Sequence, residues 1–167
     1  ALTVNPDFVE AFPTGDLRRS ASIIDLVGEG ITGSADFTTS FNDWREYTGY
    51  AVKKYAPLCY ADGSHAGKQD GSGDFQTQNR QDYVIIRYAD VLLMYAEALN
   101  EVNNDPTQEA INAVKEVRKR AFRGNEAKAA AGIPTNHDDF LTFIQKERKL
   151  ELSNEGLRRT DLTRWGK

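Results

Sequence analysis

The chain has 167 residues, a formal net charge of −4 and a hydrophobic content of 40%. This length suits one domain, and the small charge of mixed sign disfavours binding to nucleic acid. A single cysteine, Cys59, excludes an internal disulfide framework, and the sequence has neither a signal peptide at its start nor an apolar run of about 20 residues that would span a bilayer.

The first half, residues 1–82, is expected to be rich in loops. Asn5 followed by Pro6 is typical of a helix start and predicts a short helical turn. The apolar residues 22–27 and the alternating residues 47–55 each predict a short strand. The sequence between these strands is rich in glycine, threonine, aspartate and asparagine, which favours turns over regular structure.

The second half, residues 83–167, is expected to be helical. Asp105 and Pro106 predict the N-cap and first position of a second helix, which ends before Gly124. The short connection predicts two antiparallel helices, as in one tetratricopeptide unit, and a single unit cannot bury its outer face without further helices. One face of the helix before Asp105 carries apolar residues at steps of three and four, namely Tyr88, Val91, Leu92, Tyr95, Leu99 and Val102.

Charged residues occupy a core-facing stripe in the last part of the chain. A helix is predicted over residues 139–153, capped by Asp138 or the residue after it, and another over residues 157–165. The apolar face that begins at Phe140 and Ile144 continues in register into charged side chains. Because burying an unpaired carboxylate costs several kcal/mol, we predict a partly buried structural ion network. Its members are Glu147, Arg148, Glu151, Arg158, Asp161 and Arg164.

The sequence indicates no catalytic residue, metal site or cofactor. Glu147 and Glu151 lie one helical turn apart and can in principle act as paired carboxylates, but the nearby arginines would neutralise them. His65 and His137 lie in loop-like sequence without the spacing of metal ligands. A nucleophile elbow, a phosphate loop and a dinucleotide fingerprint are all absent from the sequence. We therefore expect binding rather than catalysis.

Two stretches, residues 87–101 and 147–166, resemble in spacing and order the signature of the SusD/RagB family. Asp16 and Arg18 resemble the Asp-x-Arg element of that family, and residues 53–55 resemble its basic-aromatic segment. The resemblance implies a mainly α fold with a tetratricopeptide-like helical hairpin plus C-terminal helices, and an irregular, loop-rich N-terminal half containing short strands. It also implies that the whole chain, residues 1–167, is the C-terminal portion of a longer SusD/RagB-like domain.

The resemblance implies a function at the bacterial surface. Family members are noncatalytic lipoproteins of Bacteroidetes-type bacteria that serve nutrient uptake and polysaccharide utilization. They are tethered to the outer membrane by a lipid anchor, which is expected on the parent protein and is absent from this chain. The expected partners are a glycan or oligosaccharide and a SusC-like TonB-dependent transporter. Structural roles are implied for the shared charged residues of the helical half, including Arg87, Asp90, Glu97 and Glu101.

Sugar binding is expected in the loop-rich half of the chain. Sugars present flat patches of C–H groups flanked by hydroxyls, so a site combines exposed aromatic rings with amide or charged side chains at its rim. Residues 42–79 supply both kinds of side chain. The candidate ligand-binding residues are Trp44, Tyr47, Tyr50, Tyr60 and Phe75. For each ring the alternative is core packing or loop anchoring.

Two other classes of function stay open. Tetratricopeptide-like helices commonly dock a partner peptide, so the chain can instead be a protein-interaction module without sugar binding. A concave aromatic patch around residues 44–75 would favour a glycan, and a charged groove between the helices would favour a peptide. A glycoside hydrolase would need two carboxylates about 5 to 10 Å apart beside a cleft, and the sequence indicates no such pair.

Overall fold

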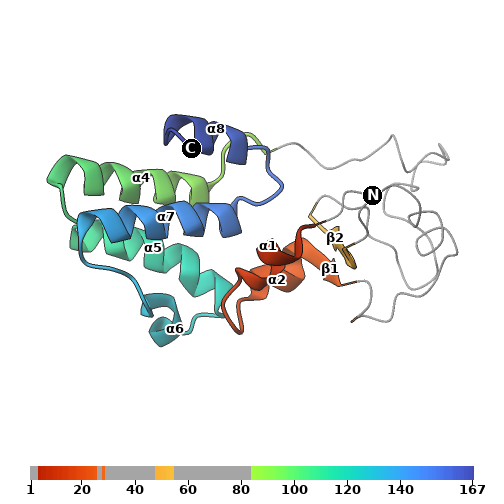
Figure 1. The fold of residues 1–167 in the computed structure, drawn as a ribbon. Coiled ribbons are helices and arrows are strands. Elements are labelled where there is room, and N and C mark those ends of the chain that lie inside the picture. The colour runs from red at the N-terminus through yellow and green to blue at the C-terminus, as the bar shows by residue number, and fades with distance from the viewer. Residues whose placement is uncertain (1–3, 26–27, 29–47, 55–83) are drawn as a thin grey trace, which may run out of the picture.

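The computed structural model describes residues 4–25, 28, 48–54 and 84–167. These residues form seven helices and one two-stranded sheet, so the mainly α fold class predicted from the sequence is confirmed. Figure 1 shows three long helices side by side, with shorter helices and the sheet next to one end of them. Within the described ranges, none of the helices has the length and apolar character needed to cross a membrane.

The three long helices are α4 (Tyr88–Asn103), α5 (Gln108–Ala121) and α7 (His137–Glu151). Helix α4 packs against both others and runs antiparallel to them. Alanines in the interface let the helix axes approach closely. Asn100, which is fully buried, also joins two of the helices, because its Nδ2 donates to the backbone oxygen of His137 at 3.1 Å. The buried core between the helices consists of Leu93, Ala96, Ala110, Ala113, Val114, Val117, Phe140 and Ile144.

The N-terminal part forms a second, smaller core against the end of α7. It contains α1 (Pro6–Glu10), α2 (Leu17–Ser22), β1 (Ile23–Asp25) and β2 (Tyr50–Val52). The two strands pair antiparallel over their whole length, with Ile23 opposite Val52 and Asp25 opposite Tyr50. The buried members of this core are Val4, Val9, Phe12, Ile23 and, from α7, Leu150. Leu150 therefore joins the N-terminal segment to the helical bundle.

Two short helices complete the described fold. Helix α6 (Glu126–Ala130) follows α5, and α8 (Arg158–Arg164) follows α7 and lies beside α4 in Figure 1. The guanidinium of Arg118 fastens α6 to α5, since its Nε donates to the backbone oxygen of Ala129 at 2.7 Å. Arg118 Nη2 also donates to the backbone oxygens of Lys128 and Ala131. These hydrogen bonds satisfy carbonyl groups at the end of α6 that have no partner within the helix.

Several local predictions were wrong. Helices α2 and α6 were not predicted, because each has too few residues to show an apolar periodicity. The cap of α5 is Thr107 rather than Asp105, and its hydroxyl accepts from the backbone N–H of Ala110 at 3.2 Å. The cap of α7 is Asn136 rather than an aspartate, and α7 begins at His137, which was expected in a loop. Neighbouring residues of these types are all good caps, so the sequence does not distinguish them.

The apolar stripe predicted on α4 lies largely on the outside. Tyr88 and Val102 are 72% and 82% exposed, and Val91 and Tyr95 are exposed as well. We call these residues the outer face of α4. The side that faces α5 and α7 is instead centred on Leu93 and the small residues near it. Helix α4 carries apolar residues on more than one side. The apolar periodicity of the sequence therefore did not reveal which side packs against α5 and α7.

The first prediction concerns the main core. Replacing Phe140 with alanine should lower the free energy of unfolding by about 3 to 5 kcal/mol, because a ring that is fully buried leaves a cavity. The exposed Val102→Ala substitution is the control and should change it by less than about 0.5 kcal/mol. Urea denaturation followed by circular dichroism measures both values. Equal effects of the two substitutions would contradict the assigned core.

Candidate functional site

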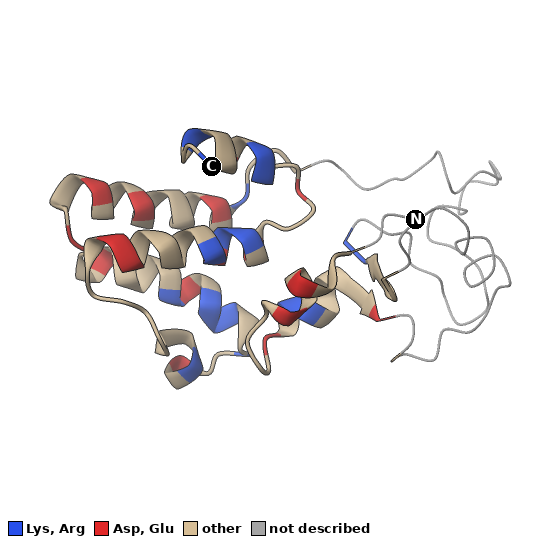
Figure 2. Ribbon diagram, viewed as in Figure 1, with Lys and Arg blue, Asp and Glu red and all other residues tan. Residues whose placement is uncertain are grey.

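The polar interior of the protein lies at one end of the three-helix bundle. Because α4 is antiparallel to α5 and α7, its N-terminus lies beside their C-termini, and Figure 2 shows acidic and basic positions together in this region. The ion pairs there form two groups. The first ion cluster consists of Asp16, Arg18, Lys54, Arg87, Arg118, Arg120, Glu147, Glu151 and Glu155. The second ion cluster consists of Asp90, Glu97, Arg148, Asp161 and Arg164.

Glu147 connects the N-terminal segment to α5 and α7. Its carboxylate is buried and accepts from Arg18 Nη1 at 2.5 Å and from Arg118 Nη1 at 3.2 Å. Arg18 is held in place by Asp16, which caps α2 and pairs with Arg18 Nη2 at 2.6 Å. The local sequence Asp-x-Arg therefore starts a helix and also aims a guanidinium into the bundle. Breaking any one of these buried pairs would leave a charge without compensation.

Glu151 is surrounded by arginines from three different segments. Its carboxylate is 2% exposed and pairs with Arg87 Nη1 at 2.6 Å, with Arg18 Nη1 at 3.2 Å and with Arg120. Burial by itself raises the pKa of Glu151, but the hydrogen bond from Arg87 and the nearby positive charges outweigh burial, so the pKa is lowered. A carboxylate held ionised in this way is a poor proton donor. Among the described residues, no group of His, Cys, Asp or Glu side chains is placed to hold a metal ion.

Glu155 joins the two ends of a chain segment that is far from it in sequence. It accepts from Lys54 and from Arg87, whose Nε lies 2.9 Å from Oε2. Both cations also bind the C-terminal end of α7: Arg87 Nη2 donates to the backbone oxygen of Glu151 at 2.6 Å, and Lys54 Nζ donates to the same oxygen at 3.2 Å. Positive charge at this end of a helix is favourable. We call Lys54, Arg87 and Glu155 the Glu155 clamp.

The Glu155 clamp lies at both ends of a segment that contains two of the predicted sugar-binding rings. Trp44, Tyr47, Tyr60 and Phe75 lie outside the residues that the structure describes. The segment with Tyr60 and Phe75 begins after Lys54 and ends before Arg87, so the Glu155 clamp holds both its ends. Tyr50 lies in β2, where it is partly buried and packs against the smaller core. Its role as a ligand contact stays a prediction.

The second ion cluster holds α8 against α4 and α7. Arg148 lies between two carboxylates, with its Nη1 at 2.7 Å from Asp90 and its Nε at 2.9 Å from Asp161. Arg164 pairs with Asp161 at 3.0 Å and with both oxygens of Glu97. Glu97 also accepts from the indole of Trp165 at 2.7 Å. The end of α8 is therefore fastened to the middle of α4 by charge-assisted hydrogen bonds.

The structure divides the six residues of the predicted ion network. Glu147 and Glu151 lie in the first ion cluster, and Arg148, Asp161 and Arg164 lie in the second. Arg158 lies in neither. It is exposed, and its guanidinium carbon lies 5.9 Å from the centroid of the Trp165 ring.

Sequence reasoning did not identify Arg118, Arg120 and Glu155 as members of the first ion cluster. A signal for Arg118 was present, because it follows Val114 by four residues on the stripe of α5 that faces the core. This is the same kind of signal that pointed to Glu147. No comparable signal exists for Glu155, which lies in the turn after α7, where no periodicity applies.

The second prediction tests the cost of the buried charge. Replacing Glu151 with glutamine should lower the free energy of unfolding by an amount on the order of 3 kcal/mol, because three arginines lose their shared counter-ion. Glu126→Gln is the matched control, since the pair of Glu126 with Lys119 is exposed and should contribute little. Urea denaturation of both variants at pH 7 makes the comparison. An equal decrease in the free energy of unfolding for the two variants would show that burial of the ion pair does not determine how much stability is lost.

The third prediction concerns pH. The pKa values of Glu151 and Glu155 are both lowered in the folded state, where burial alone would raise them, because paired arginines and Lys54 outweigh it. The unfolded chain therefore takes up protons first as the pH falls below the ordinary glutamate pKa of about 4.3. Stability should be level above that pH and decrease below it. Glu151→Gln should flatten this decrease, as measured by urea denaturation between about pH 3 and pH 7; parallel profiles would refute the assignment.

Comparison with known proteins gives consistent matches. Residues 5–167 match the family model of the SusD family. The chain is 32% identical to SusD-like protein P2 and 30% identical to SusD-like protein P25, both from Formosa agariphila, over 89% and 96% of its length. It is also similar to a solved SusD homolog from Bacteroides thetaiotaomicron, with a TM-score of 0.63 and 28% identity over 96% of the chain. The chain spans 28% and 25% of the two curated relatives and 31% of the solved chain.

Proposed function

This chain belongs to the SusD family, and we propose that the protein containing it binds a glycan or oligosaccharide at the bacterial cell surface without chemically altering it. Membership of the family supports a carbohydrate-binding role in nutrient uptake. We further propose that the bound oligosaccharide passes to a SusC-like TonB-dependent transporter and that a lipid anchor holds the protein to the outer membrane. The family match over residues 5–167 is the observation that carries this proposal.

The arrangement of the described residues supports a division between a rigid frame and binding segments. Both ion clusters consist of side chains that are paired with one another, so their hydrogen-bonding groups are used within the frame. The frame brings together the ends of the segment that contains Tyr60 and Phe75, through Lys54 and Arg87. A ligand site on segments that a rigid scaffold positions is a common arrangement in proteins.

The physics of such a site favours reversible capture. Ring stacking and a few hydrogen bonds give dissociation constants in the micromolar to millimolar range, about −8 to −4 kcal/mol. Affinity in this range lets the protein concentrate sugar at the surface and still release it to a transporter. A noncatalytic role is consistent with the two carboxylates that the sequence singled out, because Glu147 and Glu151 are both neutralised by arginines.

A protein-interaction module is the second candidate function, and the outer face of α4 favours it. Tyr88, Val91, Tyr95 and Val102 are exposed on one helix. Exposed apolar residues grouped in this way commonly mark a surface that another helix or peptide covers. Under this alternative, sugar would not bind, and substitutions on α4 would affect the association with a protein partner.

The fourth prediction separates the two functions. Trp44→Ala in the full-length protein should weaken the binding of oligosaccharides by about tenfold, because an indole ring offers the largest stacking surface to a sugar. Tyr88→Ala on the outer face of α4 is the aromatic control and should leave the affinity for sugar unchanged. Isothermal titration calorimetry against a panel of glycans measures both.

The same experiment has two contrary outcomes. Unchanged affinity of the Trp44→Ala variant would remove Trp44 from the site while keeping the glycan-binding function. Failure of the unsubstituted protein to bind any glycan in the panel would favour the interaction module.

A further inference from the structure

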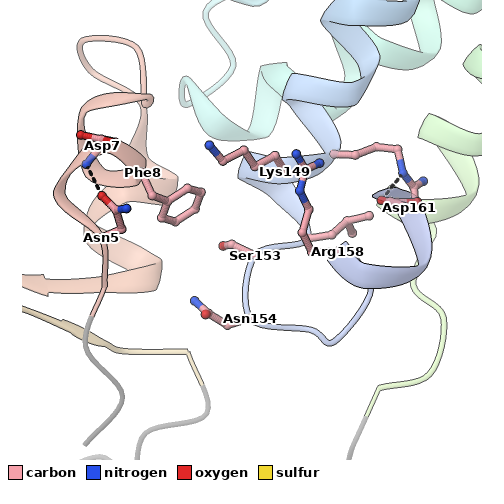
Figure 3. Close-up of a pocket in the computed structure, with 10 residues that line it drawn as sticks. Asn5, Asp7, Phe8, Lys149, Ser153, Asn154, Arg158 and Asp161 are labelled. Carbon is pink, nitrogen blue, oxygen red and sulfur yellow. Dashed lines mark hydrogen bonds and ion pairs between the residues drawn. The ribbon is translucent and has the colours of Figure 1, made fainter. Parts of the chain in front are cut away.

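A pocket lies between the two ends of the described chain. It is a cavity of about 430 Å³ between α1, the end of α7, the turn after α7 and α8. Figure 3 shows Phe8 on one side of it, Lys149 above it, Ser153 below it and Arg158 on the far side. We call it the α1–α8 pocket. Residues as far apart in the sequence as Asn5 and Asp161 form its walls, so the pocket exists only in the folded chain.

Two cations in the wall differ from the arginines of the ion clusters. Arg148, which also lines the pocket, is paired with Asp90 and Asp161. Lys149 and Arg158, in contrast, form no ion pair with a described residue. Their close neighbours are rings, since Lys149 Nζ lies 5.5 Å from the centroid of Phe8 and Arg158 lies over Trp165. Within the described part of the chain, their N–H donors therefore have no anionic partner and are available to an anion.

A buried hydroxyl in the same wall also lacks a partner. Ser153 Oγ is buried and has no hydrogen-bond partner among the described residues. The amide side chains of Asn5 and Asn154 line the rim nearby. A buried hydroxyl without a partner is unfavourable, and a bound polar group that supplies the missing hydrogen bond removes that cost.

The charges of the lining favour a negative group. Asp161 accepts from Arg148 Nε at one oxygen and from Arg164 Nε at the other, so both its oxygens are engaged within the second ion cluster. Asp7 is the other carboxylate that lines the pocket, and it is exposed at the rim. Among the lining residues, the three cations Arg148, Lys149 and Arg158 outnumber the carboxylates of Asp7 and Asp161 by one. The ring of Phe8 adds an apolar surface of the kind on which the C–H face of a sugar stacks.

We propose that the α1–α8 pocket binds the negatively charged substituent, a carboxylate or a sulfate, of an acidic saccharide. Arg158 and Lys149 hold the anionic group by charge-assisted hydrogen bonds, Phe8 contacts the sugar ring, and Ser153 and the amides bind hydroxyls. This inference rests on the proposed function, because it names the class of glycan that the protein takes.

The test is isothermal titration calorimetry of the full-length protein with matched charged and neutral sugars. One arm compares tetragalacturonate with its fully methyl-esterified form, and the other compares a sulfated galactan tetrasaccharide with its desulfated form. We expect at least one charged form to bind about tenfold more tightly than its neutral counterpart. The arm that shows the difference identifies the group as a carboxylate or a sulfate.

Substitutions assign the effect to the pocket. Arg158→Gln and Lys149→Gln should each weaken the binding of the charged sugar by about tenfold and leave the neutral form unaffected. Arg159→Gln is the matched control, because Arg159 is an exposed neighbour with the same charge that does not line the pocket, and it should change affinity by less than about twofold. Thermal unfolding of each variant checks that the fold is retained.

Each contrary result has a separate meaning. Equal binding of charged and neutral sugars, or an equal loss for Arg158→Gln and Arg159→Gln, would overturn the anion site and leave the proposed glycan function standing. Absence of binding to all four saccharides and to the wider panel of glycans would overturn both.

Discussion

The buried carboxylate of Glu151 is the constraint on which the rest of this structure depends. It lies at the C-terminal end of α7, where the helix dipole is unfavourable to negative charge. Its burial is tolerated because arginines from α2, from α5 and from the start of α4 all reach it. Satisfying this one charge therefore fixes how four parts of the chain lie against one another. Buried pairs of this kind specify geometry more than they add stability.

The ion clusters also determine where the segments outside the frame begin and end. Lys54 and Arg87 are separated by 32 residues along the chain, yet both bind Glu155 and the last carbonyls of α7. The antiparallel pairing of β1 with β2 brings together the ends of the segment that contains Trp44. Changes of sequence within such segments need not disturb the frame. A rigid scaffold that positions variable segments is a common arrangement for binding sites in proteins.

Two parts of the surface contrast with the paired charges of the ion clusters. The outer face of α4 is apolar and exposed, and the α1–α8 pocket contains cations and a hydroxyl without partners among the described residues. The first is suited to contact with protein, since apolar area gains free energy when it is covered. The second is suited to a charged sugar, since its donors gain most from an anion. The two surfaces lie on different elements, so one protein can use both.

The sequence by itself determined the long helices, the short strands and the burial of charge on α7, because apolar periodicity, turn residues and charges on a core-facing stripe are all local properties. The resemblance of residues 87–101 and 147–166 to the SusD/RagB family also came from sequence. Only the tertiary structure decided which arginine meets which carboxylate, that Arg158 stays outside both ion clusters, and which side of α4 is covered. Those outcomes depend on contacts between residues far apart in the chain, and no local pattern records such contacts.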